Sequence, residues 1–177
     1  MTTRAPRPKR PRRRPPLATV PASWNPSLVV FACNWCSYAG ADTAGVSRIQ
    51  QQPFFRMIRV MCSGRIQPGF VLRAFERGAD GVLVSGCHFG DCHYVSGNER
   101  AVALFEKTMR VVGMLGLEQG RLRLEWISAA EGARFAQVIN EFTDQVRALG
   151  PSPFARRAPE PGAPAVPAPA AVASAGG

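Results

Sequence analysis

The sequence predicts an α/β protein of flavodoxin- or Rossmann-like type, with an open, mainly parallel four-stranded sheet and helices on both faces. Two observations carry this prediction. Four short runs are rich in apolar and β-branched residues, as strands are, and each run is followed by a stretch with helical features. Repeated alternation of strand and helix indicates parallel strands joined by helical crossovers.

The predicted strands are the four apolar runs at residues 28–32, 57–61, 82–85 and 122–127. Three of the helices have clear signals. Residues 98–117 carry apolar side chains at alternating spacings of three and four positions, which form one apolar stripe. A similar stripe runs through residues 130–149 and stops at Gly150. Pro68 begins a shorter helix that ends near Gly78.

The charge of the chain is unevenly distributed. The 177 residues carry a formal net charge of +10, but the first 25 hold seven basic and no acidic side chains. Residues 1–25 therefore predict a disordered, basic Pro/Arg-rich arm, because they have too few apolar side chains to form a core. Residues 151–177 are rich in Pro and Ala and predict a disordered tail. The α/β domain is expected at 26–150, and its near-neutral charge does not favour nucleic-acid binding.

No apolar run approaches the roughly 20 residues that a membrane-spanning helix needs. Arg12, Arg13 and Arg14 are similar to part of a twin-arginine export signal, but Pro15 and Pro16 take the place of its apolar segment. We therefore expect a cytoplasmic protein in a reducing compartment. In such a compartment, five cysteines indicate metal ligands or redox thiols rather than disulfides.

All five cysteines lie at or just after the carboxyl ends of predicted strands. Cys33 and Cys36 follow the first strand, and Cys62 follows the second. Cys87 follows the third strand, and Cys92 lies in the turn after it. Because parallel strands end at one edge of the sheet, these thiols are expected to converge there. Thiolates favour zinc, copper(I) or iron–sulfur centres over hard cations, so the sequence predicts a metal site formed by these cysteines.

Two alternatives stay open at this point. Cys33 and Cys36 form a C-x2-C motif between a strand and a helix, which is typical of a thiol–disulfide or persulfide redox enzyme. That interpretation leaves three cysteines unexplained. The basic arm suggests a nucleic-acid-binding module with a structural zinc, although a body of this size forms a core without zinc. His88 and His93 are expected to donate hydrogen bonds to sulfur or to pack, rather than to bind metal.

The segments around the cysteines resemble the delta subunit of the methyl-viologen-reducing hydrogenase. They are FACNWCSYAGAD (31–42), RVMCSGR (59–65), GCH (86–88), GDCHY (90–94) and SGN (96–98). The resemblance extends over about 28–150 and leaves out the arm and the tail. It departs from the family at Phe89, where many members have proline, and this affects the turn between Cys87 and Cys92.

The resemblance implies a [2Fe-2S] cluster with four of the five cysteines as ligands, from the set Cys33, Cys36, Cys62, Cys87 and Cys92. It also implies an iron–sulfur subunit that relays electrons between a hydrogenase or formate dehydrogenase and a heterodisulfide reductase-type flavin subunit. The chain itself has no phosphate-binding glycine loop, hydrolase triad or flavin motif. We therefore expect a component of an oxidoreductase complex with no catalysis of its own.

Overall fold

The computed structural model describes residues 24–155, and it has the predicted alternation of strands and helices. In chain order the main elements are β1 (Leu28–Cys33), α1 (Ser37–Val46), β2 (Phe55–Val60), α2 (Pro68–Glu76), β3 (Gly81–Gly86), α3 (Gly97–Met114), β4 (Leu122–Trp126) and α4 (Gly132–Leu149). Two short 3-10 helices, η1 (Ser63–Arg65) and η2 (Gln119–Arg121), precede α2 and β4. The predicted α/β class is confirmed.

The four strands form one open, entirely parallel sheet with the order β2-β1-β3-β4. From β1 the chain moves first to one side, to β2, and then to the other side, to β3. Such a reversal creates a crevice at the carboxyl ends of the two strands that flank it. Here those strands are β1 and β3, which pair from Leu28 opposite Gly81 to Ala32 opposite Ser85. The topology therefore favours a binding site where β1 and β3 end.

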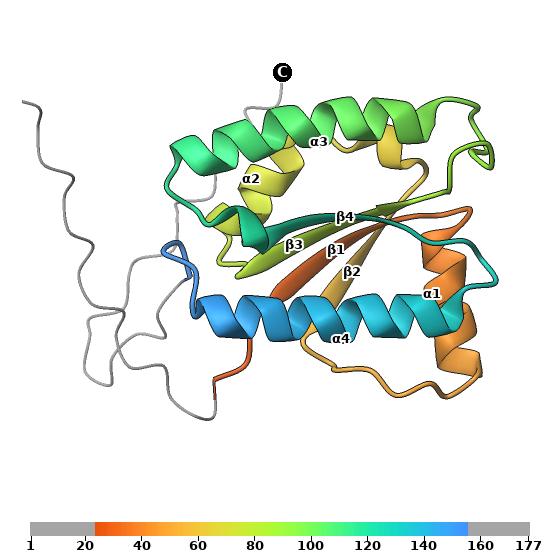
Figure 1. Ribbon diagram of the computed structural model, residues 1–177, viewed down its shortest axis with the longest axis horizontal. Helices are drawn as coiled ribbons and strands as arrows, with labels where there is room; N and C mark the ends of the chain where they lie inside the picture. The colour runs from red at the N-terminus through yellow and green to blue at the C-terminus, as the bar shows by residue number, and fades with distance from the viewer. Residues whose placement is uncertain (1–23, 156–177) are drawn as a thin grey trace, which may run out of the picture.

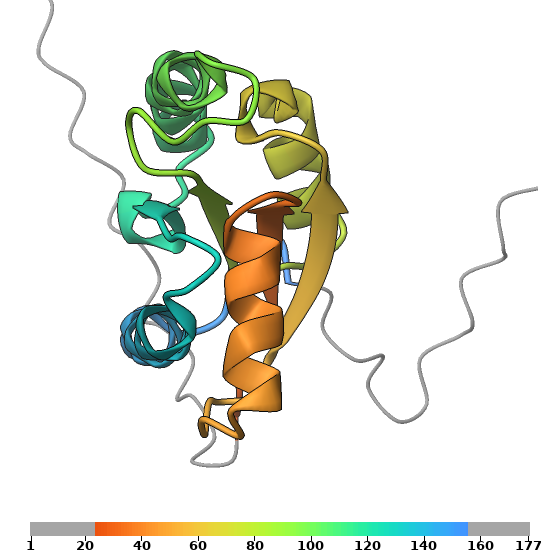
Figure 2. The same ribbon diagram turned by 90° about the vertical axis from the view of Figure 1, so that its right-hand side faces the viewer.

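Helices cover both faces of the sheet, with α1 and α4 on one side and α2 and α3 on the other (Figure 1 and Figure 2). Successive residues of β1 point to opposite faces, as the period of a strand requires. Leu28, Val30 and Ala32 belong to the core beneath α4, whereas Phe31 joins the core beneath α2 and α3. Phe135 of α4 is fully buried, and burying a side chain of this kind contributes about 1.5–3 kcal/mol.

Polar groups close the amino-terminal edge of the sheet. Arg121 is buried there and donates hydrogen bonds to the carbonyl oxygens of Gly150 (2.9 Å) and Asp80 (3.1 Å). The carboxylate of Asp80 in turn accepts the backbone N–H groups of Ser27 and Ser152, both at 2.8 Å. These bonds join the segments before β1 and after α4 to the start of β3. This edge is therefore stabilised by structural contacts and lies opposite the cysteines.

The predicted arm and tail lie outside the described residues, apart from 24–25 and 151–155. Residues 151–155 end in a turn, and Ser152 is buried against Asp80. Within residues 24–155, no helix is long and apolar enough to cross a membrane.

Candidate metal centre

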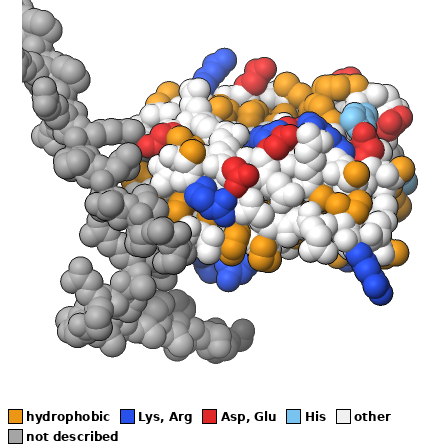
Figure 3. All heavy atoms as spheres, turned by 60° about the horizontal axis from the view of Figure 1, so that its bottom comes forward, with side chains coloured by type: hydrophobic (Ala, Val, Ile, Leu, Met, Phe, Trp, Pro, Cys, Tyr) orange, Lys and Arg blue, Asp and Glu red, His pale blue; other side chains and the backbone are white. Residues whose placement is uncertain are grey.

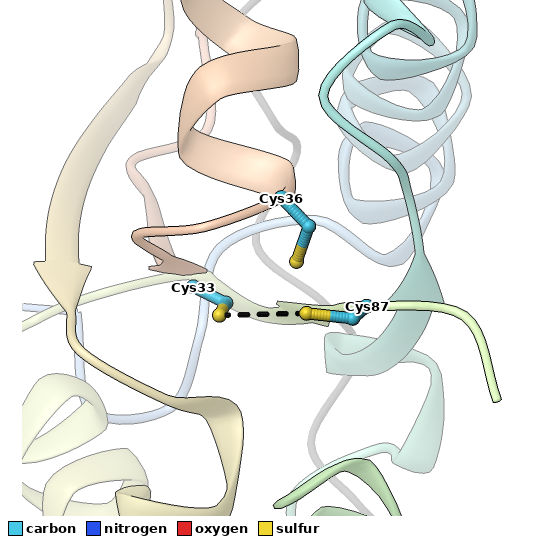
Figure 4. A group of neighbouring side chains, drawn as sticks. All are labelled: Cys33, Cys36 and Cys87. Atoms are coloured by element: carbon cyan, nitrogen blue, oxygen red, sulfur yellow. Dashed lines mark hydrogen bonds between the residues drawn. The ribbon is translucent and has the colours of Figure 1, made fainter. Parts of the chain in front are cut away.

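Three cysteines meet at the carboxyl edge of the sheet. The sulfur atoms of Cys33, Cys36 and Cys87 all lie within 4.8 Å of one another, and those of Cys33 and Cys87 are 3.8 Å apart. Figure 4 shows the three side chains pointing toward one another from the ends of β1 and β3 and the start of α1. All three are buried. The sheet topology thus brings together Cys33 and Cys87, which are 54 positions apart in the chain.

The backbone holds these thiols at fixed points. Cys33 is the last residue of β1, and Cys36 is the N-cap of α1. The buried hydroxyl of Ser37 joins the two strand ends, because it accepts the N–H of Cys33 (3.0 Å) and donates to the carbonyl of Ser85 in β3 (3.0 Å). The sequence alone does not reveal this role, since a serine at the start of a helix usually bonds to neighbouring backbone groups.

Cys62 and Cys92 form a pair beside the three. A β-carbon at Gly97 would lie 2.2 Å from Cys62 Sγ and 3.0 Å from Cys92 Sγ, so both sulfurs face the same glycine. The pair adjoins the three because Cys33 Sγ lies 3.8 Å from the carbonyl oxygen of Met61, which directly precedes Cys62. Cys62 is buried and Cys92 is partly exposed. All five cysteines therefore lie at one edge, as a group of three and a neighbouring pair.

The three buried thiols perturb one another's ionisation. Hydrogen bonding from the Cys36 thiol lowers the pKa of Cys33 to about 5, against the opposing effect of burial. The pKa of Cys36 is raised, first by its hydrogen bond to Cys33 and then by burial. Burial raises the pKa of Cys87 to about 11. A bound metal centre favours the thiolate form of all three.

This donor set fits a soft metal centre. Three buried thiols that share one space match the preference of zinc and iron–sulfur centres for cysteine sulfur. The N-terminus of α1 directly follows Cys36 and has the polarity that favours negative charge. Cys62 and Cys92 offer a further ligand from the same edge.

Comparison with known proteins places this arrangement in a family. Residues 28–150 match the family described as methyl-viologen-reducing hydrogenase, delta subunit. The chain belongs to this family. The match covers all four strands and all five cysteines of this delta-subunit chain, and it confirms the resemblance found in the sequence.

Relatives of the delta-subunit chain occur as separate proteins and within a larger one. The vhc iron-sulfur subunit of the F420-non-reducing hydrogenase of Methanococcus voltae is 51% identical over 133 residues, which are 73% of this chain and 90% of the relative. The iron-sulfur subunit of the F420-non-reducing hydrogenase of Archaeoglobus profundus is 49% identical, over 75% of this chain and 97% of the relative. One subunit of the ferredoxin/F420H2-dependent CoB-CoM heterodisulfide reductase of Methanosarcina acetivorans is 48% identical, over 82% of this chain but 18% of that longer protein.

Polar side chains hold the loop after β3 in this delta-subunit chain. Asn98 is buried, and its amide donates to the carbonyls of His88 (2.8 Å) and Cys87 (3.4 Å). His88 Nε2 lies 2.6 Å from Glu131 Oε2, and the same oxygen accepts the N–H of Ser128 at 2.7 Å. These hydrogen bonds, first that from the Ser128 N–H and then that from His88, lower the pKa of Glu131 to about 2. Glu131 therefore joins the loops that follow β3 and β4.

The two histidines differ from each other in their contacts. His93 stacks on Trp35, with ring centroids 3.8 Å apart, which is one of the two roles predicted for it. His88 pairs with Glu131 instead, and so the prediction that it bonds sulfur or packs is wrong. The reason is a carboxylate 43 positions away, which the fold brings to the imidazole. The stack of Trp35 on His93 joins the turn between β1 and α1 to the loop before α3.

Proposed function

We propose that this chain is an electron-transfer subunit whose cysteines hold a [2Fe-2S] cluster in the cytoplasm, with no catalysis of its own. The observation that carries the proposal is the group of buried thiols, Cys33, Cys36 and Cys87, at the crevice between β1 and β3. Relatives named as iron-sulfur subunits, which the chain matches over most of their length, support it. When bound, such a cluster supplies one-electron oxidation and reduction.

We assign the fourth ligand to Cys62. It is buried, and the preceding residue, Met61, places its carbonyl oxygen 3.8 Å from Cys33 Sγ. Cys92 is partly exposed, and its sulfur accepts the N–H of Gly97 at 3.2 Å. Four cysteine ligands complete a cluster of this type, so Cys92 is the thiol that is left over.

The chain's own residues bury and orient the thiols. Ser37 fixes the backbone of Cys33 relative to β3 through two hydrogen bonds of 3.0 Å. The burial of Cys33, Cys36 and Cys87 keeps water away from their sulfur atoms. Burial and hydrogen bonding around the ligands are the means by which a protein sets the reduction potential of such a centre.

The proposed partners are a hydrogenase or a formate dehydrogenase on one side and a heterodisulfide reductase-type flavin subunit on the other. The relatives support this choice in two ways. Those named iron-sulfur subunits are named as parts of a hydrogenase. This chain also matches 18% of a longer heterodisulfide reductase protein. In that protein, the matching region is joined covalently to the rest. A domain that is fused to such a protein in one case is expected to lie beside its counterpart when it is a separate chain.

The two alternatives receive less support. Cys33 has the lowered pKa of a reactive thiol, but the residue is only 1% exposed, whereas a catalytic thiol must be reached by its substrate. The nucleic-acid-binding alternative depends on the basic arm, most of which lies outside the described residues. Metal content separates a structural zinc from an iron–sulfur cluster.

The test begins with anaerobic purification of the full chain, followed by analysis of iron, zinc and acid-labile sulfide and by electron paramagnetic resonance. We expect about two iron and two sulfide per chain and a signal that appears on one-electron reduction. Zinc without iron or sulfide would contradict the proposed iron–sulfur cluster. In a mixture of the hydrogenase or formate dehydrogenase and the flavin subunit, electron transfer should require this chain. An equal rate without it would overturn the relay.

A further inference from the structure

A cavity of about 340 Å³ opens beside Cys62 at the carboxyl edge of the sheet. It lies between the segment from Met61 to Arg65 and the start of α3. These two segments pack closely, because a β-carbon at Gly64 would lie only 2.6 Å from the carbonyl oxygen of Gly97. Two tightly packed backbone segments therefore give this cavity a defined shape.

The cavity is positively charged. Arg65 and Arg100 line it, and none of the residues that line it is acidic. Both arginines are exposed, and neither forms an ion pair within residues 24–155. Elsewhere in these residues, five arginines pair with carboxylates, namely Arg73, Arg121, Arg123, Arg134 and Arg147. Two guanidinium groups without a carboxylate over one cavity favour an anionic occupant, and the planar fork of arginine suits a carboxylate.

Exposed apolar side chains line the cavity or lie on loops at the same edge of the sheet. Met61 and Tyr94 line it, and they are 54% and 48% exposed. Val95, next to Tyr94, is 86% exposed and has a φ of 68°, a left-handed conformation that β-branched residues rarely adopt. Trp35 and Phe89 are exposed on loops at the same edge. Both histidines of the chain lie at this edge, His88 beside Glu131 and His93 on Trp35. In Figure 3 the pale-blue histidine atoms lie near both apolar and charged side chains. Exposed apolar groups and an unfavourable backbone conformation are features of contact surfaces.

We infer that an acidic side chain of a protein partner enters this cavity, while apolar residues of that partner pack on Met61 and Tyr94. The inference rests on the proposed function, because the partner is the protein that exchanges electrons with the cysteine site. The position suits this exchange, since Cys62 itself lines the cavity. The exposed apolar groups favour a protein over a free anion, which needs only Arg65 and Arg100.

Charge also excludes two other occupants. A second copy of this chain, docked with its own cavity against this one, would add two further arginines to Arg65 and Arg100 and no carboxylate. The arm at residues 1–25 has seven basic and no acidic side chains, so the arginines repel it. An acidic partner is the occupant that complements the face, and such complementarity is expected to speed association at low ionic strength.

The test uses the full chain with its cluster and, as probes, the flavin subunit and the hydrogenase or formate dehydrogenase from the same organism. We expect Arg65→Glu combined with Arg100→Glu to weaken binding to one of these proteins at least tenfold, with unchanged iron content. The control is Arg110→Glu, an exposed position on the same helix about 15 Å farther along its axis. It should change binding less than twofold. The wild-type association rate should fall as salt increases, and the double variant should lose most of this dependence.

A second variant keeps the charge and identifies the occupant. Arg65→Lys introduces an amine that a carbodiimide joins to a nearby carboxylate without a spacer. We expect mass spectrometry to find residue 65 linked to an aspartate or glutamate of the partner, and this outcome is independent of how the double variant folds. Links only to another copy of this chain, or none in a complex that forms normally, would overturn the inference.

The outcomes separate this inference from the proposed function. If the wild-type chain passes no electrons between its partners, the proposed function fails. If the wild-type chain passes electrons and the double variant does so at the same rate and affinity, the proposed function stands and the docking inference is wrong. If acetate alone protects Arg65 and Arg100 from a guanidinium-modifying reagent as well as the partner does, the cavity is a small-anion site and the inference is wrong.

Discussion

Gly97 and Cys62 lie so close together that a β-carbon on the glycine would be 2.2 Å from the cysteine sulfur. Gly97 is the first residue of α3, and its N–H bonds the sulfur of Cys92 at 3.2 Å. The start of a single helix therefore positions two of the five thiols. Glycine is required here for space rather than for its backbone freedom, because a side chain and the Cys62 sulfur cannot occupy the same volume.

Replacing Gly97 with alanine should displace Cys62 and lower the iron and sulfide content by more than half. The added methyl group has no room beside Cys62 Sγ. Gly113→Ala is the matched control in the same helix, since the nearest atom to its β-carbon is 3.8 Å away. That change should keep the cluster and stabilise the fold by roughly 0.5–1 kcal/mol, the helical preference of alanine over glycine. Equal iron content in both variants would contradict the steric argument.

Serine substitutions of the cysteines should divide them into two classes. We expect Cys33→Ser, Cys36→Ser, Cys62→Ser and Cys87→Ser each to lose or distort the cluster, because each removes a proposed ligand. Cys92→Ser should retain it. Iron content and the visible and electron paramagnetic resonance spectra of anaerobically prepared variants measure this. If the cluster survives in Cys62→Ser but not in Cys92→Ser, then Cys92 and not Cys62 is the fourth ligand. Survival in all five variants would show that these cysteines do not hold the cluster.

The sequence predicts the fold and the edge of the site because both depend on local patterns. The apolar run at 82–85 identifies the buried strand β3, and the stripe at 98–117 identifies α3. The carboxyl ends of parallel strands lie at one edge of the sheet, so cysteines at those ends are expected at that edge. The division into three thiols and a pair is not predictable in this way, because it depends on β1 lying between β2 and β3.

The contacts that stabilise the site depend on residues far apart in the chain. Glu131 and His88 are hydrogen-bonded although they lie 43 positions apart, and no local sequence pattern indicates that they interact. Arg121 is a similar case at the opposite edge. A charged residue just before a strand is usually exposed. Arg121 is buried instead, because backbone carbonyl oxygens, including that of Gly150, accept hydrogen bonds from its guanidinium group.

Glu131→Gln should destabilise the chain at neutral pH by about 1 kcal/mol, the scale of a hydrogen bond to a partly exposed charged group. The pKa of Glu131 is lowered from its ordinary value of 4.5 to about 2. The carboxylate therefore contributes its stabilisation above about pH 4.5 and loses it as the pH falls toward 2. The difference in melting temperature between wild type and variant should shrink across that range. Glu106→Gln, an exposed change in α3, is the control. A pH-independent difference would contradict the role of the charge.

Deleting residues 1–23 should leave the iron and sulfide content unchanged, because every proposed ligand lies within the described body. The deletion removes basic charge, so any contribution of the arm to partner binding should vanish at high salt, where the Debye length falls to about 3 Å at 1 M. Metal analysis of the shortened chain and binding measured at two ionic strengths test this. Loss of the cluster would show that the body begins earlier than 24.

Val95→Asn should stabilise the chain while weakening its interaction with the partner. Val95 has a φ of 68° and is 86% exposed, so the folded state carries an unfavourable backbone conformation without burying the side chain in return. Asparagine tolerates this conformation better, and relief of such strain is worth about 1 kcal/mol. The melting temperature should rise by a few degrees, since about 1 kcal/mol shifts a domain of this size by roughly 4 °C. The control is Val46→Asn, because Val46 is also an exposed valine but has no left-handed backbone conformation, and this change should give no gain in melting temperature.

If Val95 contacts the partner beside Tyr94, the stabler Val95→Asn variant should bind the partner more weakly and transfer electrons more slowly at unchanged iron content. A stabler variant with undiminished transfer would place Val95 outside the docking face and leave its strain without a function.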